Sequence, residues 1–161
     1  MTLLDLGMRL VGEIHEIPGA EDSGFIRWCH GATTLGETHD EIPWCSSFIN
    51  RLAWLLRLPR SKSAMARSWL GVGISIPTEE AMPGWDIVVL SRGSNPQAGH
   101  VGLFAGWEDS SAGRVVRLVG GNQSNGVTLA EFPVTRILGV RRLLLGPLPR
   151  TDVSGVVIDG P

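Results

Sequence analysis

Residues 42–48 read Ile-Pro-Trp-Cys-Ser-Ser-Phe and open the most regular helical pattern in the chain. Pro43 suits the first position of a helix, where no backbone N–H is needed, and Pro59 bounds the pattern at its other end. Apolar side chains recur between them at the i, i+3, i+4, i+7 spacing of one helix face: Cys45, Phe48, Ile49, Leu52, Leu55 and Leu56. The pattern predicts a helix with one buried face and a cysteine near its N-terminus.

The rest of the chain divides into helices first and strands second. The spacing of apolar residues predicts helices over 2–16 and 22–31 and a short helix over 63–70. Strand patterns follow at 86–90, 100–105, 114–119, 126–132 and 136–145, with turns rich in Gly, Asn and Ser. We therefore expect an α+β domain, with N-terminal helices packed on a C-terminal antiparallel sheet of about five strands. Residues 1–145 should form this single domain, and residues 146–161 a tail containing three prolines and three glycines.

Composition excludes several classes of protein. The chain has 161 residues, 43% of them hydrophobic and 19% charged, which is typical of one folded globular domain. A net charge of −2 gives no reason to expect a nucleic-acid partner. The N-terminus has no basic start with a long apolar run, and no stretch approaches the roughly 20 apolar residues of a membrane span. We expect a monomer made in the cytoplasm without a signal peptide and without membrane insertion.

Charge is unevenly spread along the chain. Residues 51–67 carry no acid and five basic residues, Arg51, Arg57, Arg60, Lys62 and Arg67. Such a run is compatible with a solvated basic helix and loop. It is also compatible with a face that meets an anionic polymer of the cell envelope.

Cys45 is the first candidate for chemistry. A cysteine attacks as its thiolate, and the unpaired N–H groups at a helix N-terminus lower the pKa of a thiol. The same N–H groups can hold the oxyanion of a tetrahedral intermediate. Cys45 also begins the apolar stripe of its helix, so a buried packing cysteine is the alternative.

His100 is the candidate base. It opens an otherwise apolar strand after Gly99, and strand alternation places it on the face opposite Val101. A base needs a third group that orients its ring, and residues 119–123, Val-Gly-Gly-Asn-Gln, end the next expected strand. Asn122 or Gln123 could reach the imidazole there, and an ordinary hairpin turn is the alternative.

Other residues give weaker signals. The four histidines and two cysteines have no zinc spacing, and Asp40 and Glu41 lie in no loop of alternating carboxylates, so we expect no metal and no cofactor. Asp40 and Glu41 precede Cys45 and are candidates for capping the helix or lining a cleft. Trp44 is a candidate wall of a sugar or peptide cleft.

Four motifs in order resemble one known family. Residues 40–48, 83–89 (Pro-Gly-Trp-Asp-Ile-Val-Val), 99–102 (Gly-His-Val-Gly) and 120–123 (Gly-Gly-Asn-Gln) are similar to the CHAP and NlpC-like branch of papain-fold peptidoglycan hydrolases. The chain particularly resembles its compact members, which occur as phage endolysins and secreted amidase effectors. The resemblance runs from about residue 8 to residue 145.

The resemblance implies a papain-like fold, Cys45 as nucleophile and His100 as general base and then acid. In related CHAP enzymes the region that corresponds to residues 120–123 contains an acid two residues before an asparagine. Here that acid is replaced by Gly120, so Asn122 is the expected orienting residue, with Gln123 joining Trp44, Asp40 and Glu41 in substrate binding. No metal is carried over.

The function implied is cleavage of an amide bond in bacterial peptidoglycan. The bond is either the lactyl–L-alanine amide or a peptide bond of the stem or crosslink. An endolysin released by a holin fits a chain of this kind, with a secretion-system effector as second choice. Another papain-fold thiol enzyme, such as an acyltransferase or a protein peptidase, and a non-enzymatic binding protein are the remaining alternatives.

Overall fold

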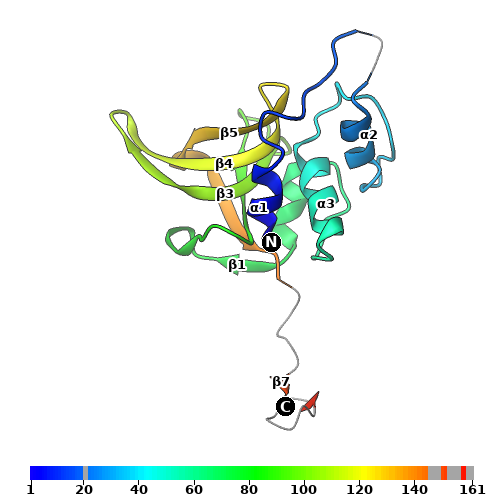
Figure 1. The fold of residues 1–161 in the computed structure, drawn as a ribbon. Helices are drawn as coiled ribbons and strands as arrows, with labels where there is room; N and C mark the ends of the chain where they lie inside the picture. The colour runs from blue at the N-terminus through cyan, green and yellow to red at the C-terminus, as the bar shows by residue number, and fades with distance from the viewer. Residues whose placement is uncertain (20–21, 145–149, 152–156, 159–161) are drawn as a thin grey trace.

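The computed structural model describes residues 1–19, 22–144, 150–151 and 157–158. It has the expected α+β class, with α1 (Leu3–Met8), α2 (Gly24–His30) and α3 (Cys45–Leu55) gathered on one side of an antiparallel sheet. Three 3-10 helices connect later elements: η1 (Ala66–Gly71), η2 (Thr78–Glu80) and η3 (Val134–Arg136). Figure 1 shows the helices to one side and a long, curved β-hairpin reaching away from them on the other.

The sheet contains one strand more than the sequence predicts. In the described residues its order is β1-β6-β2-β3-β4-β5, and every pair is antiparallel. The strands are β1 (Ile74–Ile76), β2 (Asp86–Ser91), β3 (Gly99–Ser110), β4 (Gly113–Gln123), β5 (Gly126–Pro133) and β6 (Ile137–Arg142). The missed strand, β1, has only three half-exposed or exposed residues, too few to show an alternation of their own.

The first helix is much shorter than expected. α1 ends at Met8, although apolar spacing predicted a helix through residue 16. Beyond it the backbone pairs with β5 instead: Gly12 N–H donates to Val127 O at 3.0 Å, and Val127 N–H donates to Ile14 O at 3.0 Å. Gly12, with φ +79°, supplies the left-handed turn that leaves the helix. Tertiary pairing therefore overrides the helical periodicity of this segment.

Two other expectations change in detail. Residues 63–70, predicted as an α-helix, contain the start of the 3-10 helix η1. The tail of residues 146–161 includes two paired two-residue strands, β7 (Arg150–Thr151) and β8 (Val157–Ile158). The other tail residues lie outside the described part of the chain.

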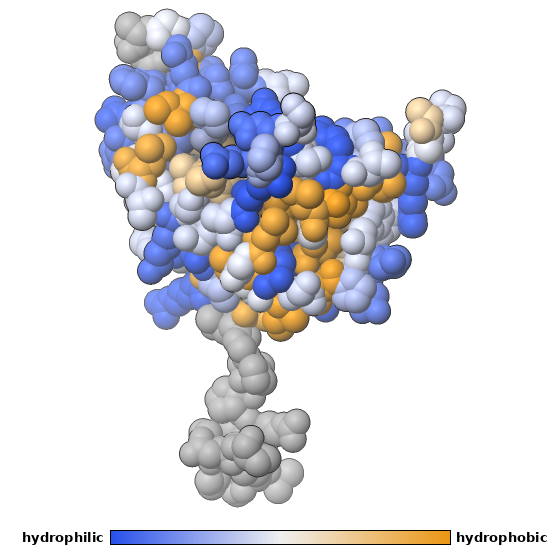
Figure 2. Space-filling view, turned by 180° about the vertical axis from the view of Figure 1, so that it is seen from behind, coloured by the Kyte–Doolittle hydropathy of each residue, from blue (hydrophilic) through white to orange (hydrophobic). Residues whose placement is uncertain are grey.

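Alternation along the strands separates two apolar clusters. Val101 and Leu103 of β3 pack against the helices, in a cluster that also holds Phe48 and Leu52 of α3. Phe104 belongs to the second cluster, with Leu118 and Val140, on the opposite face. Figure 2, from behind, shows apolar side chains gathered in one area bordered by polar ones. The sheet is therefore buried on the side where α3 meets β3 and β4, and this contact positions the candidate site.

Candidate active site

Cys45 is the first residue of α3. The residue before it, Trp44, is the N-cap, so the helix begins two residues later than Pro43. Two serines that follow Cys45 fix this first turn. Ser46 Oγ accepts from Trp69 Nε1 at 2.9 Å and donates to Ser63 O at 2.6 Å, and Ser47 Oγ is 2.8 Å from His30 Nδ1. No local pattern in the sequence indicates these partners, because they come from separate loops and helices.

The Cys45 thiol is nearly enclosed, with the residue only 4% exposed. Burial raises the pKa of the thiol above its ordinary value. The backbone N–H groups of Val101 and Ser46 oppose this rise, as does the positive charge of Arg92. The sulfur therefore lies beside the backbone of β3 at the residue that follows His100, and it faces N–H donors that would also stabilise an oxyanion.

The imidazole of His100 is held by Gln123. His100 Nε2 lies 2.8 Å from Gln123 Oε1. The amide of Gln123 cannot turn over freely, because its Nε2 donates to Thr128 O at 2.8 Å and to Leu118 O at 3.3 Å. An acceptor oxygen facing Nε2 assigns the ring proton to Nε2, which leaves Nδ1 as a proton acceptor.

His100 is buried and uncharged at neutral pH. Its pKa is lowered from 6.5 to about 4, mainly by desolvation; the Gln123 hydrogen bond opposes this decrease, and the charges of Arg92 and Arg136 add to it. Phe132 packs on the ring, with centroids 5.3 Å apart. In the free protein the His100 imidazole and the Cys45 thiol are therefore both neutral.

Asn122 does not make the contact expected of it. Its backbone has φ +58°, in the left-handed region, and the β4–β5 register shifts between Gly120 and Gln123. This irregularity breaks strand alternation and directs Gln123, rather than Asn122, at His100. The expected orienting role of Asn122 is therefore corrected: its side chain lines the cavity beside His100, whereas Gln123 holds the ring.

Two glycines make the arrangement possible. A Cβ on Gly120 would lie 2.6 Å from Gln123 Oε1 and 3.4 Å from His100 Nε2. A Cβ on Gly121 would lie 2.5 Å from the Trp44 ring and 2.9 Å from Phe48 Cβ. Gly120 leaves room for the His100–Gln123 hydrogen bond, and Gly121 lets β4 approach the start of α3.

A cavity of about 290 Å³ opens beside the imidazole. Its walls are formed by Arg92, His100, Asn122, Gln123, Ser124, Ala130, Phe132 and Arg136. Cys45 is not part of this wall, and among the described residues no hydrogen bond joins its thiol to His100. Cys45 begins α3 in the helix-side cluster, whereas His100, on β3, packs on Phe132 beside the second cluster, so the two side chains make no direct contact. Catalytic contacts of this kind often tighten only when substrate binds.

Trp44 does not line a cleft. It is fully buried, stacks edge-on against Phe48 with centroids 6.2 Å apart, and donates from Nε1 to Glu16 Oε1 at 2.9 Å. Its expected role in substrate binding is wrong, because none of its surface is available to a substrate. Glu41 is exposed in the loop before α3, and its role in substrate binding stays a prediction.

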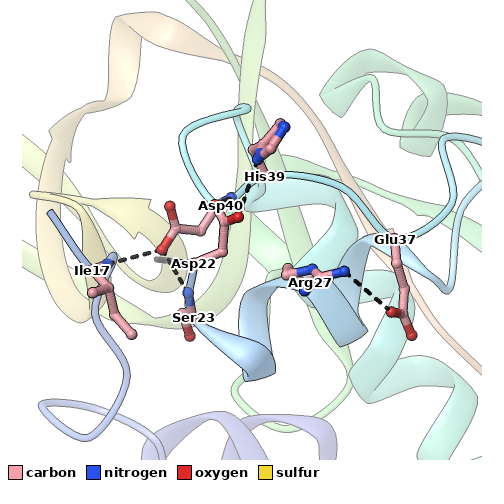
Figure 3. A network of polar contacts seen from close by, with 7 residues as sticks. All are labelled: Ile17, Asp22, Ser23, Arg27, Glu37, His39 and Asp40. Carbon is pink, nitrogen blue, oxygen red and sulfur yellow. Dashed lines mark hydrogen bonds and ion pairs between the residues drawn. The ribbon is translucent and has the colours of Figure 1, made fainter. Parts of the chain in front are cut away.

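Asp40 has a structural role in place of the predicted substrate contact. It is 1% exposed, and its Oδ2 accepts from the backbone N–H groups of Ile17 and Ser23, both at 2.8 Å. Its own N–H donates to Asp22 Oδ1 at 2.9 Å. Figure 3 shows these contacts joining three loop segments. Asp40 therefore ties the start of α2 and the preceding segment to the loop that leads into Cys45.

A larger cavity, of about 510 Å³, lies at the other end of α3. Trp54, Leu55, Arg57, Leu58 and Arg60 form its walls, which contain no nucleophile and no acid–base pair. Arg51 is not a solvated charge: it is buried, and its guanidinium lies 4.3 Å from the Trp28 ring centroid and 4.9 Å from that of Trp54. The basic run is thus not one solvated face: Arg51 is buried, Arg57 and Arg60 line this cavity, and Arg67 is half-buried and donates to Ala98 O.

Comparison with known family models and with curated protein sequences finds no match to this chain. Among the described residues, no three His, Cys, Asp or Glu side chains are grouped to hold a metal ion. Within the same residues no helix combines the length and apolarity that crossing a membrane requires.

Proposed function

We propose that the protein is a cysteine-dependent hydrolase that cleaves an amide bond of bacterial peptidoglycan, on a papain-like version of the observed α+β fold. The observation that carries the proposal is the Cys45 thiol at the first residue of α3, facing the N–H of Val101 next to a His100 whose ring is oriented by Gln123. The choice of peptidoglycan as the substrate rests on the resemblance of the four sequence motifs to those of wall hydrolases. Peptidoglycan is the only partner proposed.

Catalysis would proceed in two halves. The Cys45 sulfur attacks the amide carbonyl as His100 Nδ1 accepts the thiol proton, and the oxyanion is held by N–H groups at the start of α3 and at Val101. His100 then gives that proton to the leaving amine, which yields a thioester on Cys45. A water deprotonated by His100 attacks the thioester, releases a carboxylic acid and restores the thiol.

The depressed pKa of His100 sets its resting protonation state, and it makes the imidazole of the free protein a weaker base than an ordinary histidine. With a pKa of about 4 the imidazole is neutral at physiological pH and is ready to accept a proton. The raised pKa of Cys45 means that the proton must leave during attack and not before it. The oxygen of Gln123 stabilises the imidazolium that forms.

One observation favours a different role for Cys45. Its 4% exposure and its membership of the helix-side cluster suit a packing residue of a non-catalytic protein. Activity on the isolated wall separates the two roles.

The test is digestion of purified sacculi by the wild-type protein and by two cysteine variants. Cys45→Ala should release no soluble muropeptides, whereas Cys29→Ala, which removes a buried free thiol of α2, should keep activity within a few-fold. Circular dichroism checks that both variants fold. No release by wild type, or equal release by Cys45→Ala, would contradict the proposal. A wild-type protein that leaves sacculi intact but hydrolyses protein or thioester substrates would be one of the other thiol enzymes.

A further inference from the structure

The cavity beside His100 carries positive charge that hydrolysis itself does not require. Arg92 and Arg136 form part of its wall, and none of the described residues that line it is an aspartate or a glutamate. The remaining wall is polar or aromatic. A cavity of this composition selects an anionic group.

Arg136 is held in a fixed orientation. Its Nε donates to Ser91 O at 3.0 Å, and its guanidinium lies 5.3 Å from the centroid of the Phe132 ring, the same ring that packs on His100. Since the backbone contact uses Nε, the terminal N–H groups remain for a ligand. A planar guanidinium fixed in this way suits a carboxylate, which accepts two parallel hydrogen bonds.

Arg92 completes the pair from the end of β2. Its side chain is exposed, and its charge acts on both His100 and Cys45. The ion pairs found among the described residues use Arg27, Arg117, Arg142 and His39, so neither Arg92 nor Arg136 is neutralised by a carboxylate there. Two guanidinium groups thus line the cavity beside His100 without a counter-charge from the described chain.

We infer that Arg92 and Arg136 bind a free carboxylate on the residue next to the scissile amide, and so determine which wall bond is cut. The inference rests on the proposed function. The lactyl–L-alanine amide is a poor fit, because the lactyl carboxyl is itself the scissile carbonyl and the carboxyl of L-alanine is in amide linkage to the next stem residue, so neither side offers a free carboxylate. Amide bonds of the stem or crosslink whose neighbouring residue keeps a free carboxylate fit the pair. The protein is then an endopeptidase rather than an amidase.

The test uses two soluble muropeptides that differ only in that the stem carboxylates are free or converted to primary amides. Wild-type protein should cleave the free-acid form at least 10-fold more efficiently, measured as kcat/KM, and mass spectrometry should place the cut next to a residue bearing that carboxylate. Arg136→Gln and Arg92→Gln should each lower kcat/KM for the acid form by about 10-fold or more, consistent with the loss of a charged hydrogen bond. The amide form should change by less than about 2-fold in both variants.

Two controls keep the outcome specific. Arg57→Gln removes an exposed charge beside the larger cavity and should leave the acid-to-amide ratio unchanged. Arg136→Lys keeps the charge and should recover part of the preference. Equal cleavage of both muropeptides by wild type, a cut at the lactyl–L-alanine amide, or the same loss on both forms in Arg136→Gln would overturn the inference alone. Cleavage of neither form, with sacculi also intact, contradicts the proposed function and the inference with it.

Discussion

A single hydrogen bond assigns the roles around His100. Because Gln123 Oε1 accepts from Nε2, the nitrogen left to take a proton is Nδ1. Gln123→Ala should therefore lower kcat/KM on muropeptides by about 10- to 100-fold, through loss of ring orientation. Asn122→Ala, its neighbour in the same cavity wall, should change it by less than about 3-fold. A larger loss in Asn122→Ala than in Gln123→Ala would return the orienting role to Asn122.

The burial of His100 makes stability depend on pH. The pKa of His100 is about 4 in the folded protein and 6.5 for the free side chain, so the unfolded chain binds a proton in this window that the folded protein does not. The stabilisation that comes from keeping His100 neutral is therefore fully present above pH 6.5 and is lost as the pH falls toward 4. The loss from this group is about 3 kcal/mol, at 1.36 kcal/mol per pKa unit.

Urea denaturation of wild type and His100→Gln at pH 7.5 and 4.5 checks this prediction. The decrease in unfolding free energy between the two pH values should be smaller in His100→Gln by about 2 to 3 kcal/mol. The comparison uses the change with pH, so any constant cost of the substitution cancels. Identical changes in both proteins would mean that His100 titrates normally.

Among the contacts between helices and strands, the contact between β4 and α3 determines where the first turn of α3, and with it Cys45, lies. Gly121 lets the strand approach Trp44 and Phe48 closely, and this approach positions the first turn of α3 against the sheet. Gly121→Ala should lower the unfolding free energy by about 1 to 3 kcal/mol through overpacking and reduce activity as Cys45 shifts. Gly24→Ala, at the first position of α2 with no atom within 4 Å of the new Cβ, is the matched control and should be neutral. Equal stability of the two variants in thermal denaturation would show that the contact is loose.

Sequence patterns predicted the elements that carry a strong periodicity and failed where distant segments decide. The stripe on α3 and the alternation of β3 placed Cys45 at a helix start and separated Val101 from Phe104 correctly. The helix predicted through residue 16 was wrong because Gly12 and Ile14 pair with β5. No local pattern could reveal that pairing.

In the candidate site, too, local patterns predicted some features, and others depend on residues that are distant in the sequence. Local patterns placed Cys45 at a helix start and His100 near a strand start, and they singled out residues 120–123 as a group; the catalytic roles stay a prediction. The choice between Asn122 and Gln123 depends on an irregular register between β4 and β5, which alternation does not predict. Trp44 and Asp40 were misassigned because their partners, Glu16 and the N–H groups of Ile17 and Ser23, lie far from them in sequence.

At the scale of the whole molecule, the two apolar clusters and the six-stranded sheet are built from residues 3–143 within the described chain. An ion pair joins β6 to β2 near residue 142. Arg142 Nε and one terminal nitrogen donate to the two carboxylate oxygens of buried Asp86, at 2.7 and 2.9 Å. A variant truncated after residue 145 should therefore keep the thermal midpoint of the full chain within about 2 °C and keep its activity on sacculi. Cooperative unfolding at a clearly lower temperature would assign residues 146–161 to the folded domain.

The proposed mechanism depends on a Cys45 thiol that is nearly enclosed and yet reactive. Iodoacetamide labelling of the folded protein, followed by mass mapping of Cys45 and Cys29, measures this directly without any choice of substrate. We predict that Cys45 is alkylated at least 10-fold faster than Cys29, and that His100→Ala slows labelling of Cys45 but not of Cys29. Labelling of Cys45 only after unfolding, or at the same rate with and without His100, would contradict a nucleophile served by that imidazole.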